Sequence, residues 1–140
     1  MSTASARVTV RFDAAPEAVF DAWLEPALIR RWFGPGLGEV TTVAVAARVG
    51  GAFSIVQRRG ETDVDHVGVY LELMRPTRLA FTWSVASSTD KSRVVVDIHP
   101  LEHGCEVTLE HEMDAQWAEF VPRAEAAWTR MLEAMDAFST

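Results

Sequence analysis

The sequence has few of the features that mark secreted, membrane or nucleic-acid-binding proteins. Its single cysteine, Cys105, can form no disulfide within the chain, which favours a reducing compartment. No apolar run approaches the ~20 residues of a membrane-spanning helix, and no basic and then apolar leader precedes the first predicted strand. The net charge of −7 argues against nonspecific binding to DNA or RNA, which requires a basic surface. We therefore expect a cytoplasmic protein with no nucleic-acid partner and no membrane span.

The composition indicates one globular domain. The chain has 140 residues, of which 49% are hydrophobic and 24% charged, and this is enough apolar material for a sizeable core. We expect residues 1–140 to form a single domain.

Most of the chain predicts short antiparallel strands. Val8, Val10 and Phe12 share one face of an extended segment, and residues 38 to 47 form a β-branched strand. Further along, apolar and polar residues alternate between turns, and no helix intervenes, which predicts an antiparallel meander. The sets expected to face the core are Phe53, Ile55 and Gln57; Val67, Val69, Leu71 and Leu73; Leu79, Phe81, Trp83 and Val85; Val94, Val96 and Ile98; and Val107, Leu109, His111 and Met113.

Helices are predicted at both ends of this meander. Pro16 and Pro26 can each open a short helix, since the first helical position needs no N–H donor, and Gly34 stops the second. A helical turn is expected at residues 115 to 120, followed by a long helix over about 122 to 138. Its apolar seam consists of Ala124, Trp128, Met131, Met135 and Phe138. The pattern predicts an α+β fold in which a curved antiparallel sheet wraps around this helix and the two short helices cap one end.

Several motifs occur in order along the chain. They are Phe12-Asp13-Ala14-Ala15-Pro16-Glu17-Ala18-Val19-Phe20-Asp21-Ala22-Trp23, Arg31-Trp32-Phe33-Gly34-Pro35, Arg48-Val49-Gly50-Gly51-Ala52-Phe53, Pro76-Thr77-Arg78-Leu79-Ala80-Phe81-Thr82-Trp83, Val107-Thr108-Leu109-Glu110-His111-Glu112 and the helix from Trp128 to Met135. With these motifs the chain resembles, over roughly residues 7 to 138, the homologues of the heat-shock protein 90 ATPase activator. That family belongs to the START-like superfamily, so the resemblance implies a helix-grip fold and a carrier or sensor of hydrophobic ligands.

A bent sheet wrapped on one helix leaves an apolar pocket, the usual setting for a small-molecule site. Tryptophans from separate elements supply broad rigid walls for it, and His111 interrupts an apolar row. We expect His111 to anchor a ligand, the alternative being a structural histidine bonded to a neighbouring backbone group or Trp indole. The predicted ligand-binding residues are Trp32, Phe53, Phe81, Trp83, Leu109, His111, Trp117 and Trp128.

The sequence signatures of a catalytic or metal site are weaker than those of a ligand pocket. His99, His103 and Cys105 form an H-x₃-H-x-C cluster, but a closed zinc site takes four ligands and no fourth is near. No nucleophile elbow or phosphate-binding loop occurs. The sequence therefore predicts no catalytic residue, metal or cofactor.

Three functions remain open at this stage. The first is a noncatalytic module that binds a small hydrophobic or aromatic ligand. The second is a cyclase- or hydrolase-type enzyme with His111 as acid and base. The third, implied by the resemblance, is a partner that activates a chaperone ATPase. A homodimer formed through a sheet edge or the outer sheet face also remains open.

Overall fold

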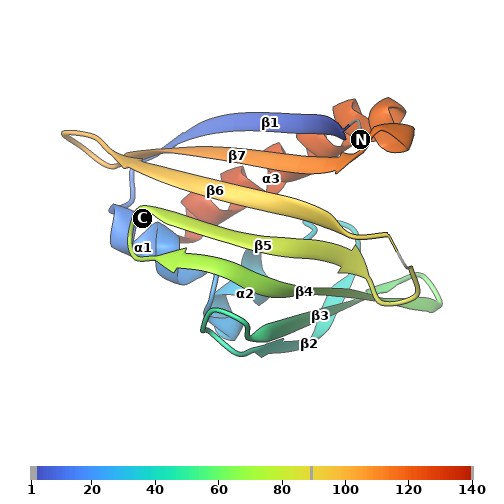
Figure 1. Ribbon diagram of the computed structural model, residues 1–140. Coiled ribbons are helices and arrows are strands. Elements are labelled where there is room, and N and C mark those ends of the chain that lie inside the picture. The colour runs from blue at the N-terminus through green and yellow to red at the C-terminus, as the bar shows by residue number, and fades with distance from the viewer. Residues whose placement is uncertain (1–2, 89, 140) are drawn as a thin grey trace.

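A computed structural model describes residues 3–88 and 90–139, with the side chains of residues 138 and 139 outside the described part. Within these residues one antiparallel sheet has the strand order β1-β7-β6-β5-β4-β3-β2 (Figure 1). The elements are β1 Thr3–Phe12, α1 Pro16–Ala22, α2 Pro26–Trp32, β2 Glu39–Val45, β3 Ala52–Arg59, β4 Thr62–Met74, β5 Arg78–Val85, β6 Ser92–Pro100, β7 Cys105–Asp114, the 3₁₀ turn η1 Ala115–Phe120 and α3 Val121–Ser139. The predicted α+β helix-grip architecture is confirmed.

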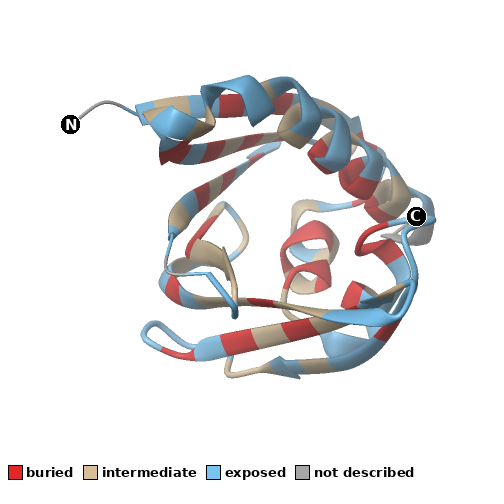
Figure 2. Ribbon diagram, turned by 90° about the vertical axis from the view of Figure 1, so that its right-hand side faces the viewer, coloured by how far each residue is buried: buried red, intermediate tan, exposed pale blue. Residues whose placement is uncertain are grey.

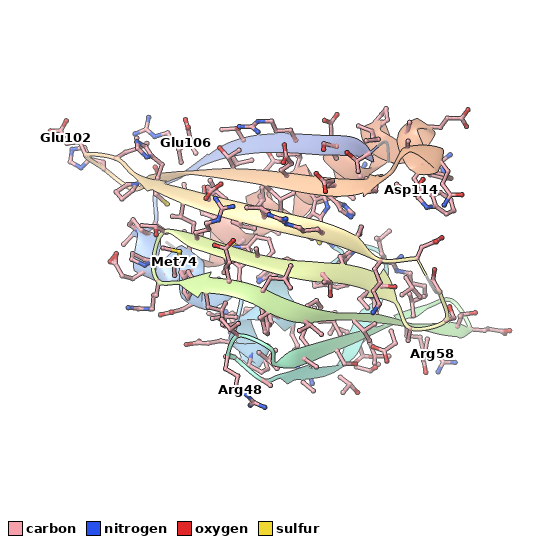
Figure 3. All side chains as sticks on the ribbon, in the orientation of Figure 1. Arg48, Arg58, Met74, Glu102, Glu106 and Asp114 are labelled. Carbon is pink, nitrogen blue, oxygen red and sulfur yellow. The ribbon has the colours of Figure 1, made fainter. Side chains whose placement is uncertain are left out.

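The long helix α3 lies across the concave side of the sheet, where it packs on β1 and on the two short helices (Figure 2). Trp128, Met131, Leu132 and Met135 are buried on its inner face. The predicted seam is thereby confirmed over its described part, while the Phe138 side chain lies outside the described residues. The opposite, convex side of the sheet carries many charged side chains (Figure 3).

The loop after α2 is fixed to the sheet by a buried glutamine. Gly34 adopts a φ of +52°, and a Cβ on it would collide with the Gln57 amide. Gln57 is fully buried and donates its Nε2 hydrogens to the carbonyl oxygens of Gly34, at 3.0 Å, and Gly38, at 3.2 Å. Because a buried amide must find partners, these bonds hold the loop against β3.

The sequence analysis predicted the wrong face of β4 to point toward the core. His66 and Tyr70 are buried, whereas Val69 and Leu71 are exposed. The pairing of β3 with β4 causes this, because His66 lies opposite the inward-facing Ile55, and residues opposite each other share a face. Gly68 lies opposite Phe53, whose ring occupies the space that a side chain at Gly68 would need. A bulge between Tyr70 and Glu72 then changes the register, and Leu73 packs against the core.

Candidate ligand-binding site

Aromatic side chains from the short helices, the sheet and α3 meet in the centre of the molecule. The ring of Trp23 lies 4.9 Å from that of Trp32, 5.9 Å from Phe81 and 6.0 Å from Trp128. Trp83 lies 5.3 Å from Trp128. Such spacings are typical of packed aromatic pairs, so the cluster is mainly core.

Only a small space remains inside this cluster. The internal cavity has a volume of about 20 Å³, close to the minimum that holds one water molecule. Its walls include four predicted site residues, Trp32, Phe53, Phe81 and Trp83. The rings of Phe53, Phe81 and Trp83 pack against one another, and the cavity leaves no room for an organic ligand.

A larger space opens at the end of the sheet opposite α1, beside the labelled Asp114 (Figure 3). This space, the η1 groove, has a volume of about 520 Å³. It lies between the β5–β6 connection, the end of β7, η1 and the first turn of α3. Its lining residues are Trp83, Ser84, Val85, Ser88, Asp90, Lys91, Ser92, His111, Met113, Asp114, Trp117, Phe120, Arg123 and Ala124.

The eight predicted residues therefore do not surround one cavity. Trp83, His111 and Trp117 line the η1 groove, whereas Trp32, Phe53 and Phe81 line the small internal cavity together with Trp83. The remaining two, Leu109 and Trp128, are buried in the core. Leu109 lies on β7 two residues before His111. Trp128 does not line the groove, but its indole is hydrogen-bonded to His111, which does.

His111 has a hydrogen-bond partner at each ring nitrogen. The Trp128 indole donates to Nδ1 at 3.1 Å, and Nε2 lies 2.7 Å from Ser92 Oγ. An indole N–H can only donate, so Nδ1 must be unprotonated and the neutral ring carries its hydrogen on Nε2. The ring then donates to Ser92, whose hydroxyl donates onward to the carbonyl oxygen of Trp83 at 2.8 Å. This chain ties α3, β7, β6 and β5 together.

The tautomer decides what the Ser92 and His111 pair can do. A histidine that activates a serine must accept the hydroxyl hydrogen at the nitrogen facing it, but here that nitrogen is the donor. Burial also lowers the pKa of His111 to about 4, so the ring is neutral at physiological pH. The contacts are those of the structural histidine bonded to a Trp indole, and the arrangement is unsuited to general-base catalysis.

One buried histidine was missed by sequence reasoning. His66 on β4 donates from Nδ1 to the carbonyl oxygen of Ile55 at 3.2 Å, and its ring lies 4.8 Å from Phe33 and 5.5 Å from Trp83. Burial lowers its pKa. Its burial follows from the pairing of β3 with β4, in which His66 lies opposite the inward-facing Ile55, and the residue type alone does not indicate it.

The residues of the suspected zinc cluster do not gather into a metal site. Cys105 is fully buried and its thiol faces the carbonyl oxygen of Ala14 at 3.5 Å. Among the described residues, no three side chains of His, Cys, Asp or Glu are grouped so as to hold a metal ion. No helix in the described part of the chain is both long enough and apolar enough to cross a membrane.

The family model described as activator of Hsp90 ATPase homolog 1-like protein matches residues 13–139. The chain belongs to this family. The family is one of the START-like group, whose fold provides a hydrophobic pocket for ligands. No match was found among curated proteins.

Solved structures of several bacterial proteins share the fold of this chain. A protein from Chromobacterium violaceum has a TM-score of 0.87 at 22% identity, with 97% of each chain covered. An AHSA1-like protein from Aeromonas hydrophila has a TM-score of 0.81 at 24% identity, with 96% of this chain and 90% of that chain covered. A protein from Staphylococcus epidermidis has a TM-score of 0.85 at 17% identity, with coverage of 99% and 91%. At these identities the likeness establishes the fold.

Proposed function

We propose that the protein is a noncatalytic carrier or sensor that binds a small hydrophobic or aromatic ligand in the η1 groove. The observation that carries the proposal is an open space of about 520 Å³ lined by aromatic and aliphatic side chains together with polar and charged ones. Trp117 and Phe120 stand 5.4 Å apart in η1, and the Phe120 side chain is 43% exposed. A bound apolar molecule would remove this surface from water, which is favourable by about 25 cal/mol per Å².

The polar groups of the groove support binding more than catalysis. Ser92 and His111 are already bonded to one another and to the protein, in the tautomer that does not activate the serine. Lys91, Arg123, Asp90 and Asp114 all line the groove. Its lining therefore has charges of both signs and favours no ionic ligand.

A neutral hydrophobic dye, N-phenyl-1-naphthylamine, tests the proposal. We expect its fluorescence to rise on binding, and Ala124→Phe to weaken binding at least about tenfold, because Ala124 lines the groove and the larger ring would occupy part of the space that the dye needs. Ala126→Phe is the matched control, since Ala126 is an exposed residue of the same helix outside the groove lining. Dissociation constants for the three proteins are measured by fluorescence titration.

Two results would contradict the proposal. One is the absence of saturable dye binding. The other is equal affinity of the Ala124→Phe and Ala126→Phe proteins, because a ligand outside the groove would not distinguish these positions. Circular dichroism melts of both variants show whether each retains the fold.

A further inference from the structure

A second pocket, the arginine pocket, shares Trp83 with the η1 groove as a lining residue. Its volume is about 160 Å³. It is formed by the loop after α2, the adjoining ends of β3 and β4, the end of β5 and the middle of α3, at the end of the sheet where Arg58 is labelled (Figure 3). The lining residues are Phe33, Gly34, Pro35, Leu37, Arg59, His66, Trp83, Ala127, Arg130 and Met131.

The charge of this pocket is opposite to that of the whole chain. The protein has a net charge of −7, yet Arg59 and Arg130 line the pocket and no Asp or Glu does. Neither arginine forms a salt bridge with any carboxylate that the structure describes. The pocket therefore has two cationic groups that no acidic side chain neutralises.

Arg59 is positioned by Gln57, the residue that also holds the loop after α2 against β3. Its Nε donates to Gln57 Oε1 at 2.8 Å, and Gln57 itself bonds to Gly34 and Gly38. This bond uses the Nε of the guanidinium group. The two terminal nitrogens of Arg59 make no hydrogen bond to a described residue. Burial lowers the pKa of Arg59, which reflects the cost of holding a cation away from water without a counter-ion.

Most of the other lining residues of the pocket are apolar. Phe33, Trp83 and Met131 face the pocket, and the His66 ring packs against the first two. His66 adds no positive charge here, because burial lowers its pKa and favours the neutral ring. The combination of aromatic walls with guanidinium groups matches a ligand that has an apolar body and one anionic end.

We propose that the arginine pocket binds a small aromatic carboxylic acid, with its carboxylate paired to Arg59 and Arg130 and its ring packed against Phe33, Trp83 and Met131. This site is separate from the η1 groove, which is lined by charged side chains of both signs. Binding here goes beyond the proposed function, and either can fail without the other.

Two probes with the same ring system separate charge from hydrophobicity. They are 2-naphthoate, which is anionic at neutral pH, and 2-naphthalenemethanol, which is neutral. Isothermal titration calorimetry at low ionic strength should show that naphthoate binds at least about tenfold more tightly, because charge-assisted hydrogen bonds to arginine are strong. Added salt should reduce this difference.

Arginine variants then locate the site. Arg130→Gln should weaken naphthoate binding about tenfold and leave the alcohol unchanged, and Arg59→Gln should act in the same way. Arg11→Gln is the matched control, because it makes the same substitution at an exposed arginine of β1 that lines neither the arginine pocket nor the η1 groove. It should leave naphthoate affinity within about twofold of wild type.

Several results would overturn the assignment. They are no naphthoate binding, equal affinities for the two probes, or equal naphthoate affinities of the Arg130→Gln and Arg11→Gln proteins. Arg59→Gln also removes the bond to Gln57, so its thermal melt is recorded. If that variant unfolds, Arg130→Gln decides the question, because Arg130 is exposed and its removal breaks no contact that the structure describes.

Discussion

Replacing Trp128 with alanine is expected to lower the free energy of unfolding by about 3–5 kcal/mol, the usual range for a buried large aromatic. Trp128 is 3% exposed and packs against Trp23 and Trp83. Its loss would leave a cavity where α3 meets the sheet, and it would remove the donor to His111 Nδ1. Denaturant melts followed by far-ultraviolet circular dichroism measure the change.

Two further variants show which part of the effect is packing. Trp128→Phe keeps most of the ring and loses the N–H, so it should cost less than alanine, with a share of about 1–3 kcal/mol from the unpaired polar groups. Trp117→Ala removes the same residue type from a half-buried position on η1, where about 1 kcal/mol is expected. A loss below about 1 kcal/mol for Trp128→Ala would show that this residue is not part of the core.

Acidification should destabilise the protein through His111. Burial holds its folded-state pKa at about 4, against an ordinary value of 6.5. Between these values the unfolded chain takes up a proton that the folded protein does not, so stability is present above pH 6.5 and is lost as the pH falls toward 4. From neutral pH to about pH 5 the expected loss from this residue is about 2 kcal/mol.

The variant His111→Gln isolates that contribution. A glutamine can still accept from Trp128 and donate to Ser92, but it does not titrate. The unfolding free energy of the variant should therefore fall less between neutral pH and about pH 5 than that of wild type, by about 2 kcal/mol. His66, whose pKa is also lowered by burial, adds a loss of the same sign to both proteins. Parallel pH profiles would show that the pKa of His111 is the same in the folded and unfolded states.

Regular patterns allowed most of the fold to be predicted. The predicted seam on α3 repeats at helical spacing over about four turns, and a single amphipathic helix has to bury its apolar face against a sheet. Pro16 and Pro26 begin the two short helices at the positions that the sequence indicates. These features depend on local spacing, which can be read without knowing the partners.

Local spacing could not show which face of β4 points toward the core. Its valines and leucines alternate with polar residues, and hydrophobicity alone favours the wrong side. The observed side is imposed by neighbouring strands, since Gly68 gives room to the Phe53 ring and the bulge after Tyr70 shifts the register. These are contacts between distant segments.

The candidate site was predicted only in part for a related reason. Trp83, His111 and Trp117 do line an open groove, but whether an inward aromatic leaves a space or fills it depends on how rings from several elements pack. Arg59 and His66 reach their pocket through the pairing of β3 with β4 and the course of the loop after α2. Neither follows from the residue types alone.

Trp83 is a wall of the small internal cavity, the η1 groove and the arginine pocket. One indole ring thus borders three compartments, and any rotation that enlarges one of them takes volume from another. Ligands that move this ring would be thermodynamically linked, and by reciprocity each would change the affinity of the other by the same factor.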